Sequence, residues 1–301
     1  MPLLSSLVGR CSEPAETDVD ARWLMAYAAG LGERGSHYLD TLRPGGVIGH
    51  PLFSVCVEWA TGQAISPPGP TGLTPGEARM GVHYAHDVVL HRPLRAGARV
   101  TTTSEVVAVT PHRAGALMVT RIDAVAEDEP QWTTWMSSLM RDVAVDGEPA
   151  STQVAPPRPP APPTDAPSVA SSVVEVAATA AHVYTECARI WNPIHTDTAV
   201  ARAAGLPGII LHGTATLALA VSHVLGLAGG VGPERVRRVC GQFGAMVLMP
   251  SELVVRVLGG DINDEGAIHF DVRTEAGQPA VRSGLVLLDT PQDPPTVTGT
   301  T

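Results

Sequence analysis

Residues Tyr184 to Leu225 read YTECARIWNPIHTDTAVARAAGLPGIILHGTATLALAVSHVL and join a polar, proline-interrupted loop to a long apolar segment. The segment is apolar around nearly its whole circumference, which is typical of a helix that a sheet surrounds on most sides. In the loop, Asn192-Pro193-Ile194 precede His195, and a His212-Gly213-Thr214 turn opens the predicted helix. Backbone N–H groups at a helix start can face a carbonyl oxygen, so this stretch predicts a site for acyl chemistry.

The composition limits the classes of protein to consider. A chain of 301 residues with 44% hydrophobic residues is long enough for two globular domains, each with its own core. The formal charge is -10, and Lys and Arg together number 20. Phosphate binding needs a basic surface, so the sequence argues against a nucleic-acid partner.

The cysteines and the apolar runs point to a location and argue against a metal. Four cysteines (Cys11, Cys56, Cys187 and Cys240) lack metal-ligand spacing, so we expect free thiols in a reducing cytoplasm, with no metal and no cofactor. The first ten residues do not resemble a signal peptide, and no run reaches about 18 uninterrupted apolar residues. We therefore expect a soluble, cytoplasmic protein without a membrane partner.

A proline-rich stretch divides the chain nearly in half. Residues 153–168, QVAPPRPPAPPTDAPS, exclude regular helix and sheet and favour an extended spacer. It is either a disordered linker or a strap packed along the surface between the halves. We predict an N-terminal domain over 1–150, a linker over 151–168, a C-terminal domain over 169–289 and a disordered tail over 290–301.

The start of the first half favours helix and then loses regularity. The acidic residues 11–20, CSEPAETDVD, suit an N-cap region before a short helix in ARWLMAYAAGLG at 21–32. Another apolar piece follows at 55–60, VCVEWA. The stretch SPPGPTGLTPGE at 66–77 is then expected to break all regular structure.

From Val82 the pattern changes to a period of two. Alternating, β-branched runs predict four antiparallel strands within 82–94, 98–112, 115–127 and 132–145. The first run carries His83, His86 and His91. Their spacing of three and five places neighbouring imidazoles on opposite faces of a strand, which disfavours a metal site and favours histidines on a sheet that meets a partner element.

The second half repeats this organisation. A strand passing into helix is predicted within 171–190 and a short helix within 196–206, followed by the long apolar helix. Four more strand-like runs occupy 235–249, 251–261, 267–277 and 280–290. A helix followed by a meander in each half predicts an α+β protein made of two hotdog units, a tandem or double hotdog with antiparallel sheet wrapped around a central apolar helix.

The central stretch resembles the active-site motif of the MaoC-like, or R-specific enoyl-CoA hydratase 2, family. That motif is roughly Y-x-x-x-S-G-D-x-N-P-I-H-x-D, followed some fifteen residues later by I-x-H-G. The first half is similar to the N-terminal domain of double-hotdog members through AYAAGLGE, HPLFSV and VHYAHDVVLHRPLRAGARV. The resemblance spans nearly the whole chain outside the linker and the tail.

The resemblance implies roles for individual residues and exposes one departure. His195 occupies the position of the catalytic histidine, Asn192 that of the asparagine beside it, and Gly213 that of the glycine whose N–H polarises the thioester carbonyl. The family's catalytic aspartate lies five residues before the histidine, where this chain has Ile190. An alkyl group cannot carry a proton, so the two-group acid–base arrangement is broken. We expect substrate-binding positions at the neighbouring residues Arg189, Ile190, Trp191, His212 and Thr214.

Three outcomes follow from this departure. Another carboxylate, Glu186 or Asp197, takes over, although Asp197 also suits the N-cap of the next helix. Alternatively, His195 acts alone as base, or the site binds acyl groups without chemistry. Arg189 either pairs with a substrate carboxylate or phosphate or is a solvated loop residue. Cys187 is either a nucleophile or a small buried apolar side chain.

The sequence therefore predicts an enoyl-thioester hydratase or 3-hydroxyacyl-thioester dehydratase, acting on acyl-CoA or acyl-carrier-protein substrates as a monomer or a homodimer of double hotdogs. Two other functions stay open. One is a lyase, isomerase or cyclase that needs His195 alone, and the other is a non-catalytic acyl-binding partner subunit.

Overall fold

The computed structural model describes residues 2–64, 71–79, 81–153, 155–163, 165–259 and 266–289, and one continuous antiparallel sheet dominates it. The strand order is β2-β4-β5-β6-β3-β10-β13-β12-β11-β9, with β8 pairing β4. The N-terminal strands are β2 (Ala15–Val19), β3 (Gly81–Leu90), β4 (Ala98–His112), β5 (Gly115–Ala126), β6 (Glu129–Arg141) and β8 (Ala150–Ser151). The C-terminal strands are β9 (Ser168–Val176), β10 (Val236–Phe243), β11 (Ser251–Leu258), β12 (Ala267–Thr274) and β13 (Pro279–Leu288).

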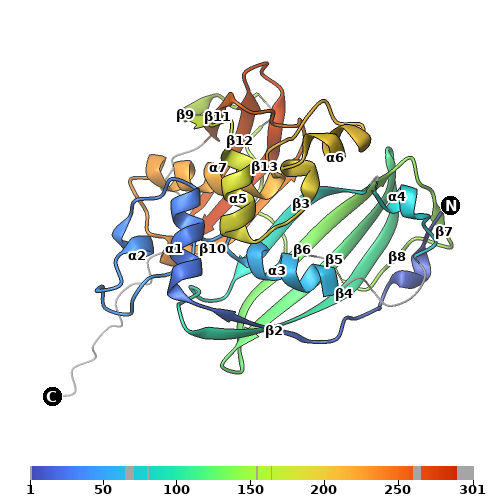
Figure 1. Cartoon of the computed structure of the whole chain (residues 1–301), viewed down its shortest axis with the longest axis horizontal. Coiled ribbons are helices and arrows are strands. Elements are labelled where there is room, and N and C mark those ends of the chain that lie inside the picture. Colours follow the sequence, from blue (N-terminus) through green and yellow to red (C-terminus); the bar gives the residue numbers. More distant parts are fainter. Residues whose placement is uncertain are drawn as a thin grey trace.

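Each half places one long helix against its part of the sheet. The helices are α1 (Ala21–Gly30), α2 (Ser36–Leu39), α3 (Ser54–Ala64), α4 (Pro75–Arg79), α5 (Ala180–Ala188), α6 (Thr198–Ala203) and α7 (Gly213–Leu227). Helix α7 packs on β9 to β13, whereas α3 packs on β2 and β4 (Figure 1). Short 3-10 turns occupy Ser5–Leu7, Pro193–His195 and Pro233–Arg235, and β1 (Leu3–Leu4) pairs in parallel with β7 (Val145–Asp146). The predicted α+β double hotdog is confirmed by this architecture.

The two halves meet where β3 pairs with β10 in antiparallel register, from Ala85 opposite Gln242 to Val89 opposite Arg238. Buried apolar side chains from both halves form one core, which includes α1, α3, α5 and α7. The two halves are therefore joined edge to edge within one chain.

The proline-rich stretch packs against this seam as a strap. Arg238 of β10 is buried and donates to the carbonyl oxygens of Pro156 at 2.7 Å and Pro157 at 2.9 Å. The same guanidinium binds Asp87 of β3 through two bonds of 2.8 Å, and Arg158 reaches Asp87 at 3.3 Å. Of the two interpretations of this stretch, a disordered linker or a packed strap, the structure agrees with the packed strap. The domain boundaries on either side of it stay a prediction.

Three local expectations need correction or lie outside the description. Residues 15–19 form the edge strand β2, because AETDV alternates with period two; the capping role falls to Asp20, whose carboxylate accepts from Trp23 N at 2.7 Å. Helix α4 interrupts the stretch that was expected to be irregular, because Thr74 and Glu77 form a reciprocal capping box. The predicted tail, 290–301, lies outside the described residues.

Among the described residues, no helix is long and apolar enough to cross a bilayer.

Candidate active site

A short turn after α5 holds His195 in place. Helix α5 ends at Ala188, and Arg189 takes the left-handed conformation (φ 57°) that closes it. The side chain of Asn192 then accepts from Ile194 N at 3.4 Å, and its carbonyl accepts from His195 N at 3.1 Å. The proline at 193 fits the first position of this 3-10 turn because its missing N–H is not needed there. The sequence N-P-I-H therefore fixes the backbone of the turn that ends at His195.

The imidazole of His195 is held in one tautomer. Its Nδ1 lies 2.8 Å from the carbonyl oxygen of Ile210, which can only accept, so Nδ1 carries the proton and Nε2 keeps a lone pair. The residue is 9% exposed, and this burial lowers the pKa of His195, although the bond to Ile210 opposes the shift. A neutral imidazole with an available Nε2 is the form that a general base requires.

His212 stacks on His195 and is also neutral. The ring centroids lie 3.6 Å apart with an interplanar angle of 25°. Burial, reinforced by the neighbouring His195, lowers the pKa of His212 to about 2, and its Nε2 lies 3.3 Å from the hydroxyl oxygen of Thr185. Two charged imidazoles could not stack in this buried position, so the pair favours a neutral His195.

The start of α7 offers backbone donors next to this pair. The first bond inside the helix runs from Thr216 N to the carbonyl of His212 at 3.0 Å. Among the described residues, the N–H of Gly213 has no hydrogen-bond acceptor. A Cβ at Gly213 would lie 3.1 Å from the ring of Phe243, so glycine allows the aromatic ring to lie directly over the helix start. The unpaired N–H and the positive helix end together suit a developing oxyanion.

A series of hydrogen-bonded hydroxyl groups connects the same helix start to the N-terminal half. The hydroxyl of Tyr184 donates to Thr214 Oγ1 at 3.1 Å, and it lies 3.3 Å from the hydroxyl of Tyr27 on α1. Tyr27 in turn donates to the carbonyl of Leu52. The tyrosine that the motif places eleven residues before His195 thus orients α7, and the hydroxyl of Thr214 is engaged in this anchoring network.

The three residues at and beside the position of the missing aspartate, Arg189, Ile190 and Trp191, have different surroundings. Ile190 is 5% exposed and belongs to the hydrophobic core. The guanidinium of Arg189 lies 3.8 Å from the ring centroid of Trp23, so Arg189 stacks on the N-terminal half, a placement that neither sequence interpretation included. Trp191 is 61% exposed and lines an open groove of about 400 Å³. The other residues lining that groove are His182, Thr185, Glu186, Pro193 and Thr196.

The alternative reactive side chains have other surroundings. The carboxylate of Asp197 accepts from Ala199 N and Val200 N, at 2.8 and 3.1 Å, as the N-cap of α6. Burial, with a smaller effect of Glu186, raises the pKa of the Cys187 thiol, which disfavours a nucleophilic thiolate. A Cβ at Gly30 of α1 would lie 2.9 Å from Cys187 Sγ, so this thiol packs between two helices.

Two groups near the site were missed by sequence reasoning. Phe243 covers the start of α7, and His83 of β3 contacts Phe243 with ring centroids 4.9 Å apart. His83 and His86 were expected on opposite strand faces, but their rings are 5.5 Å apart because a register shift lies between His83 and Ala85. Nothing in the sequence pattern announces that bulge.

Comparison with known proteins finds matches to part of the chain, mainly in the C-terminal half. Residues 162–278 match the family model described as a MaoC like domain. A segment of 77 residues is 40% identical to a fatty acid synthase subunit beta of Aspergillus oryzae, and this match covers 25% of the chain. It spans about 4% of the length of that much larger relative.

Two solved structures resemble nearly the whole chain. A MaoC-like dehydratase from Phytophthora capsici superposes with a TM-score of 0.79 at 20% identity, covering 94% of this chain and 98% of that one. A Mycobacterium tuberculosis protein described as having a double hotdog fold gives a TM-score of 0.59 at 16% identity, covering 93% and 96%. At these identities the likeness establishes the fold.

Proposed function

We propose that this chain is a hydro-lyase for acyl thioesters, because residues 162–278 match the model of a MaoC like domain and the chain has a double-hotdog fold. It would remove water from a 3-hydroxyacyl thioester, or add water to a 2-enoyl thioester. The observation that carries the proposal is the neutral His195, with Nε2 unprotonated, on the loop beside the unpaired N–H groups that open α7. The partial match to a fatty acid synthase subunit supports fatty acyl groups as substrates.

The proposed roles follow from the atoms available. Nε2 of His195 removes the proton from the carbon next to the thioester, and the Gly213 N–H stabilises the resulting enolate oxygen. The hydroxyl at the third carbon then leaves as water with the same proton, which the imidazolium returns. Asn192 positions His195 through its backbone and does not need to touch the substrate.

The single-histidine route is favoured because no carboxylate is available where the family has one. Ile190 is buried among apolar side chains, and Asp197 caps α6. One base can both take and return the proton when the thioester acidifies the carbon and the enolate is held at a helix start. The same arrangement would serve a lyase, isomerase or cyclase that begins with the same proton abstraction.

The deciding experiment follows the absorbance of the conjugated thioester. Purified protein is mixed with 2-enoyl thioesters of several chain lengths, carried either on CoA or on an acyl carrier protein. We expect turnover by the natural sequence, loss of it in His195→Ala, and retention in His91→Ala, which removes an exposed imidazole at the far end of β3. Ile190→Asp should raise turnover by restoring a second proton carrier.

A non-catalytic acyl-binding subunit is the second candidate, and Ile190 is the observation that favours it. Calorimetric titration with a saturated acyl-CoA separates the two functions. Tight binding without turnover on any chain length would replace the hydro-lyase with the binding function. Absence of both binding and turnover would reject both.

A further inference from the structure

Two buried imidazoles on β3 belong to neither the proton-transfer step nor the packing of an apolar core. His86 is fully buried, and neither of its ring nitrogens has a hydrogen-bond partner among the described protein atoms. Nε2 of His83 is likewise buried without a partner. A buried polar atom without a partner is unfavourable, so the two imidazoles are suited to a polar ligand atom.

The sheet register shows that His86 points toward α7. His86 lies directly opposite Gly241 in the antiparallel pair of β3 and β10. Residues directly opposite one another project from the same face of a sheet. A Cβ at Gly241 would lie 3.1 Å from Cδ1 of Leu217, which belongs to α7. The face that His86 occupies is therefore the one that α7 covers.

The pair is continuous with the start of α7 through one aromatic ring. The register shift after His83 brings its ring to 5.5 Å from that of His86. His83 then meets Phe243 edge-on at 4.9 Å, and Phe243 lies over Gly213. Phe243 therefore contacts both Gly213 and His83, and it links the imidazole pair to the start of α7.

The chemistry of the pair selects the kind of group that it can hold. Burial lowers the pKa of His83 to about 4 and that of His86 to about 3, so both rings are neutral near pH 7. A neutral imidazole offers one N–H donor and one acceptor. Such a pair suits a hydroxyl or keto oxygen, whereas a carboxylate would need cations and a plain alkyl chain would leave the nitrogens unpaired.

We propose that His83 and His86 bind an oxygen function on the acyl chain of the substrate, beyond Phe243, and so select oxygenated acyl groups over plain alkyl ones. This inference rests on the proposed function, because it takes Gly213 as the position of the thioester. It assigns the N-terminal half a part in choosing the substrate, while the C-terminal half performs the chemistry.

The test compares matched substrates. One is an eight-carbon 2-enoyl-CoA, and the others are the same thioester with a hydroxyl or keto group at the fifth, sixth or seventh carbon. We expect at least one oxygenated substrate to exceed the plain one in kcat/KM by about tenfold or more. His86→Leu and, separately, His83→Phe should bring that ratio close to one. Tyr84→Phe, on the intervening residue that contacts His112 instead, should leave it unchanged.

Several outcomes would overturn the inference while leaving the proposed function intact. A natural sequence that does not discriminate between the substrates is one. Equal losses for plain and oxygenated substrates in both histidine variants are another, because the pair would then be structural. If no substrate turns over, the same ratio is measured as dissociation constants of the saturated acyl-CoA counterparts, and an unchanged ratio in both variants rejects the inference. Thermal unfolding of each variant verifies that it is folded.

Discussion

The helices α3 and α7 occupy corresponding places in the two halves, yet the second and third N–H groups of their first turns are bonded differently. In α3, the N–H groups of Val55 and Cys56 find the carbonyl oxygens of Leu52 and Phe53 at 3.3 and 3.0 Å, whereas the first N–H, that of Ser54, has no acceptor among the described residues. At α7, the N–H groups of Gly213, Thr214 and Ala215 all lack an acceptor among the described residues. Unpaired donors at a helix start can bind an oxyanion, so under the proposed function α7 offers more free donors to the substrate than α3 does.

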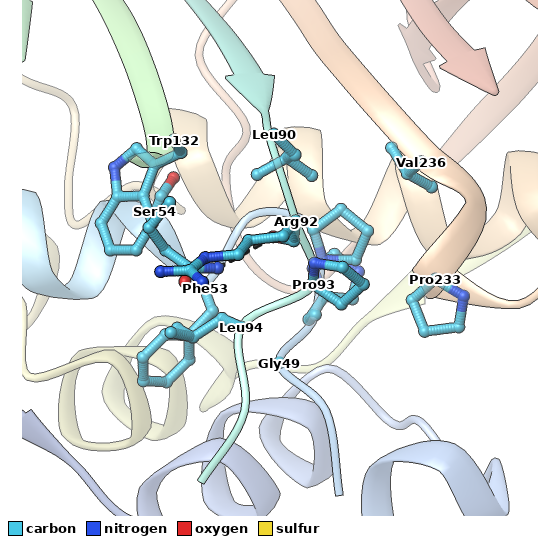
Figure 2. A pocket seen from close by; sticks show the side chains of 13 residues that line it. Gly49, Phe53, Ser54, Leu90, Arg92, Pro93, Leu94, Trp132, Pro233 and Val236 are labelled. Atoms are coloured by element: carbon cyan, nitrogen blue, oxygen red, sulfur yellow. Dashed lines mark hydrogen bonds between the residues drawn. The ribbon is translucent and has the colours of Figure 1, made fainter. Parts of the chain in front are cut away.

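The cavities near these two parts of the molecule also differ in volume. Phe53, Trp132 and Leu94 enclose a cavity of about 20 Å³ at the start of α3, and the side chain of Arg92 extends across it toward Ser54 (Figure 2). A cavity of that size has room for about one water molecule. Beside the His195 loop lies an open groove of about 400 Å³. The start of α3 is therefore sealed, whereas in the C-terminal half an open groove lies beside the turn that precedes His195.

The largest expected effect comes from removing the unpaired donor itself. Gly213→Pro deletes this N–H at the first helical position, where proline is favoured, and His212 already has the extended conformation (φ -59°, ψ 138°) that precedes a proline. Gly213→Ala is the matched control, because it adds the same Cβ beside Phe243 but keeps the N–H. We expect the proline variant to lose about 10²–10³-fold more kcat/KM than the alanine variant. Equal activities would show that this N–H is not the oxyanion donor.

The next effect concerns the sealed half, where α3 buries a carboxyl group. Burial raises the pKa of Glu58 to about 7, against hydrogen bonds from Thr134 and Trp132 that lower it. An acid with a raised native pKa keeps its proton longer when folded, so its contribution to stability is greatest below the unfolded value of 4.5 and falls as the pH rises toward 7. Glu58→Gln should remove a pH-dependent loss on the order of 3 kcal/mol over that window.

Urea unfolding of both proteins at intervals between pH 4 and pH 8 measures the Glu58 effect. The free energy of unfolding of Glu58→Gln should gain on that of the natural sequence as the pH rises. Parallel pH curves for the two proteins would contradict a carboxyl that stays protonated in the folded state.

A smaller effect is expected where the turn before α3 touches α7. Nε2 of His50 lies 3.2 Å from the hydroxyl oxygen of Ser222, a bond between the two halves. Ser222→Ala should lower the free energy of unfolding by about 1 kcal/mol. Because this contact lies away from the start of α7, kcat/KM should not change. A tenfold fall in kcat/KM would mean that the sealed turn supports the chemistry after all.

The smallest expected effect is a displacement of the pH profile. The base His195 must be neutral to accept a proton, and burial lowers its pKa. The acid limb of kcat/KM should therefore have its midpoint below pH 6.5, the ordinary value for histidine. A midpoint at or above 6.5 would indicate that another group limits the reaction or that His195 is more hydrated than its burial implies.

The sequence was informative where one local rule decides the structure. Period-two runs placed β3 to β6 and β10 to β13, and the apolar circumference of 213–227 placed α7. The Thr74–Glu77 capping box was readable in the sequence but was overlooked beneath the prolines and glycines around it. The edge strand β2 was missed because its acidic residues resemble those of a helix start.

The site was only partly predictable, because its critical contacts join distant segments. The loop and the helix start could be named from the motif, but the tautomer of His195 depends on the carbonyl of Ile210, fifteen residues away. The position of Arg189 depends on Trp23 in the other half. The meeting of His83 with His86 depends on a one-residue slip between strands. Such contacts depend on tertiary packing, and no repeating pattern of residues in a single sequence indicates them.

The buried guanidinium of Arg238 makes the length of the proline-rich stretch important for stability. A surface linker can be lengthened at little cost, since doubling a flexible loop costs only about 0.6 kcal/mol. Here, however, the guanidinium of Arg238 donates hydrogen bonds both to two carbonyl oxygens of the stretch and to the carboxylate of Asp87. The stretch is therefore part of the contact between the two halves and not a free linker. An inserted residue would weaken the hydrogen bonds that satisfy the buried charge of Arg238.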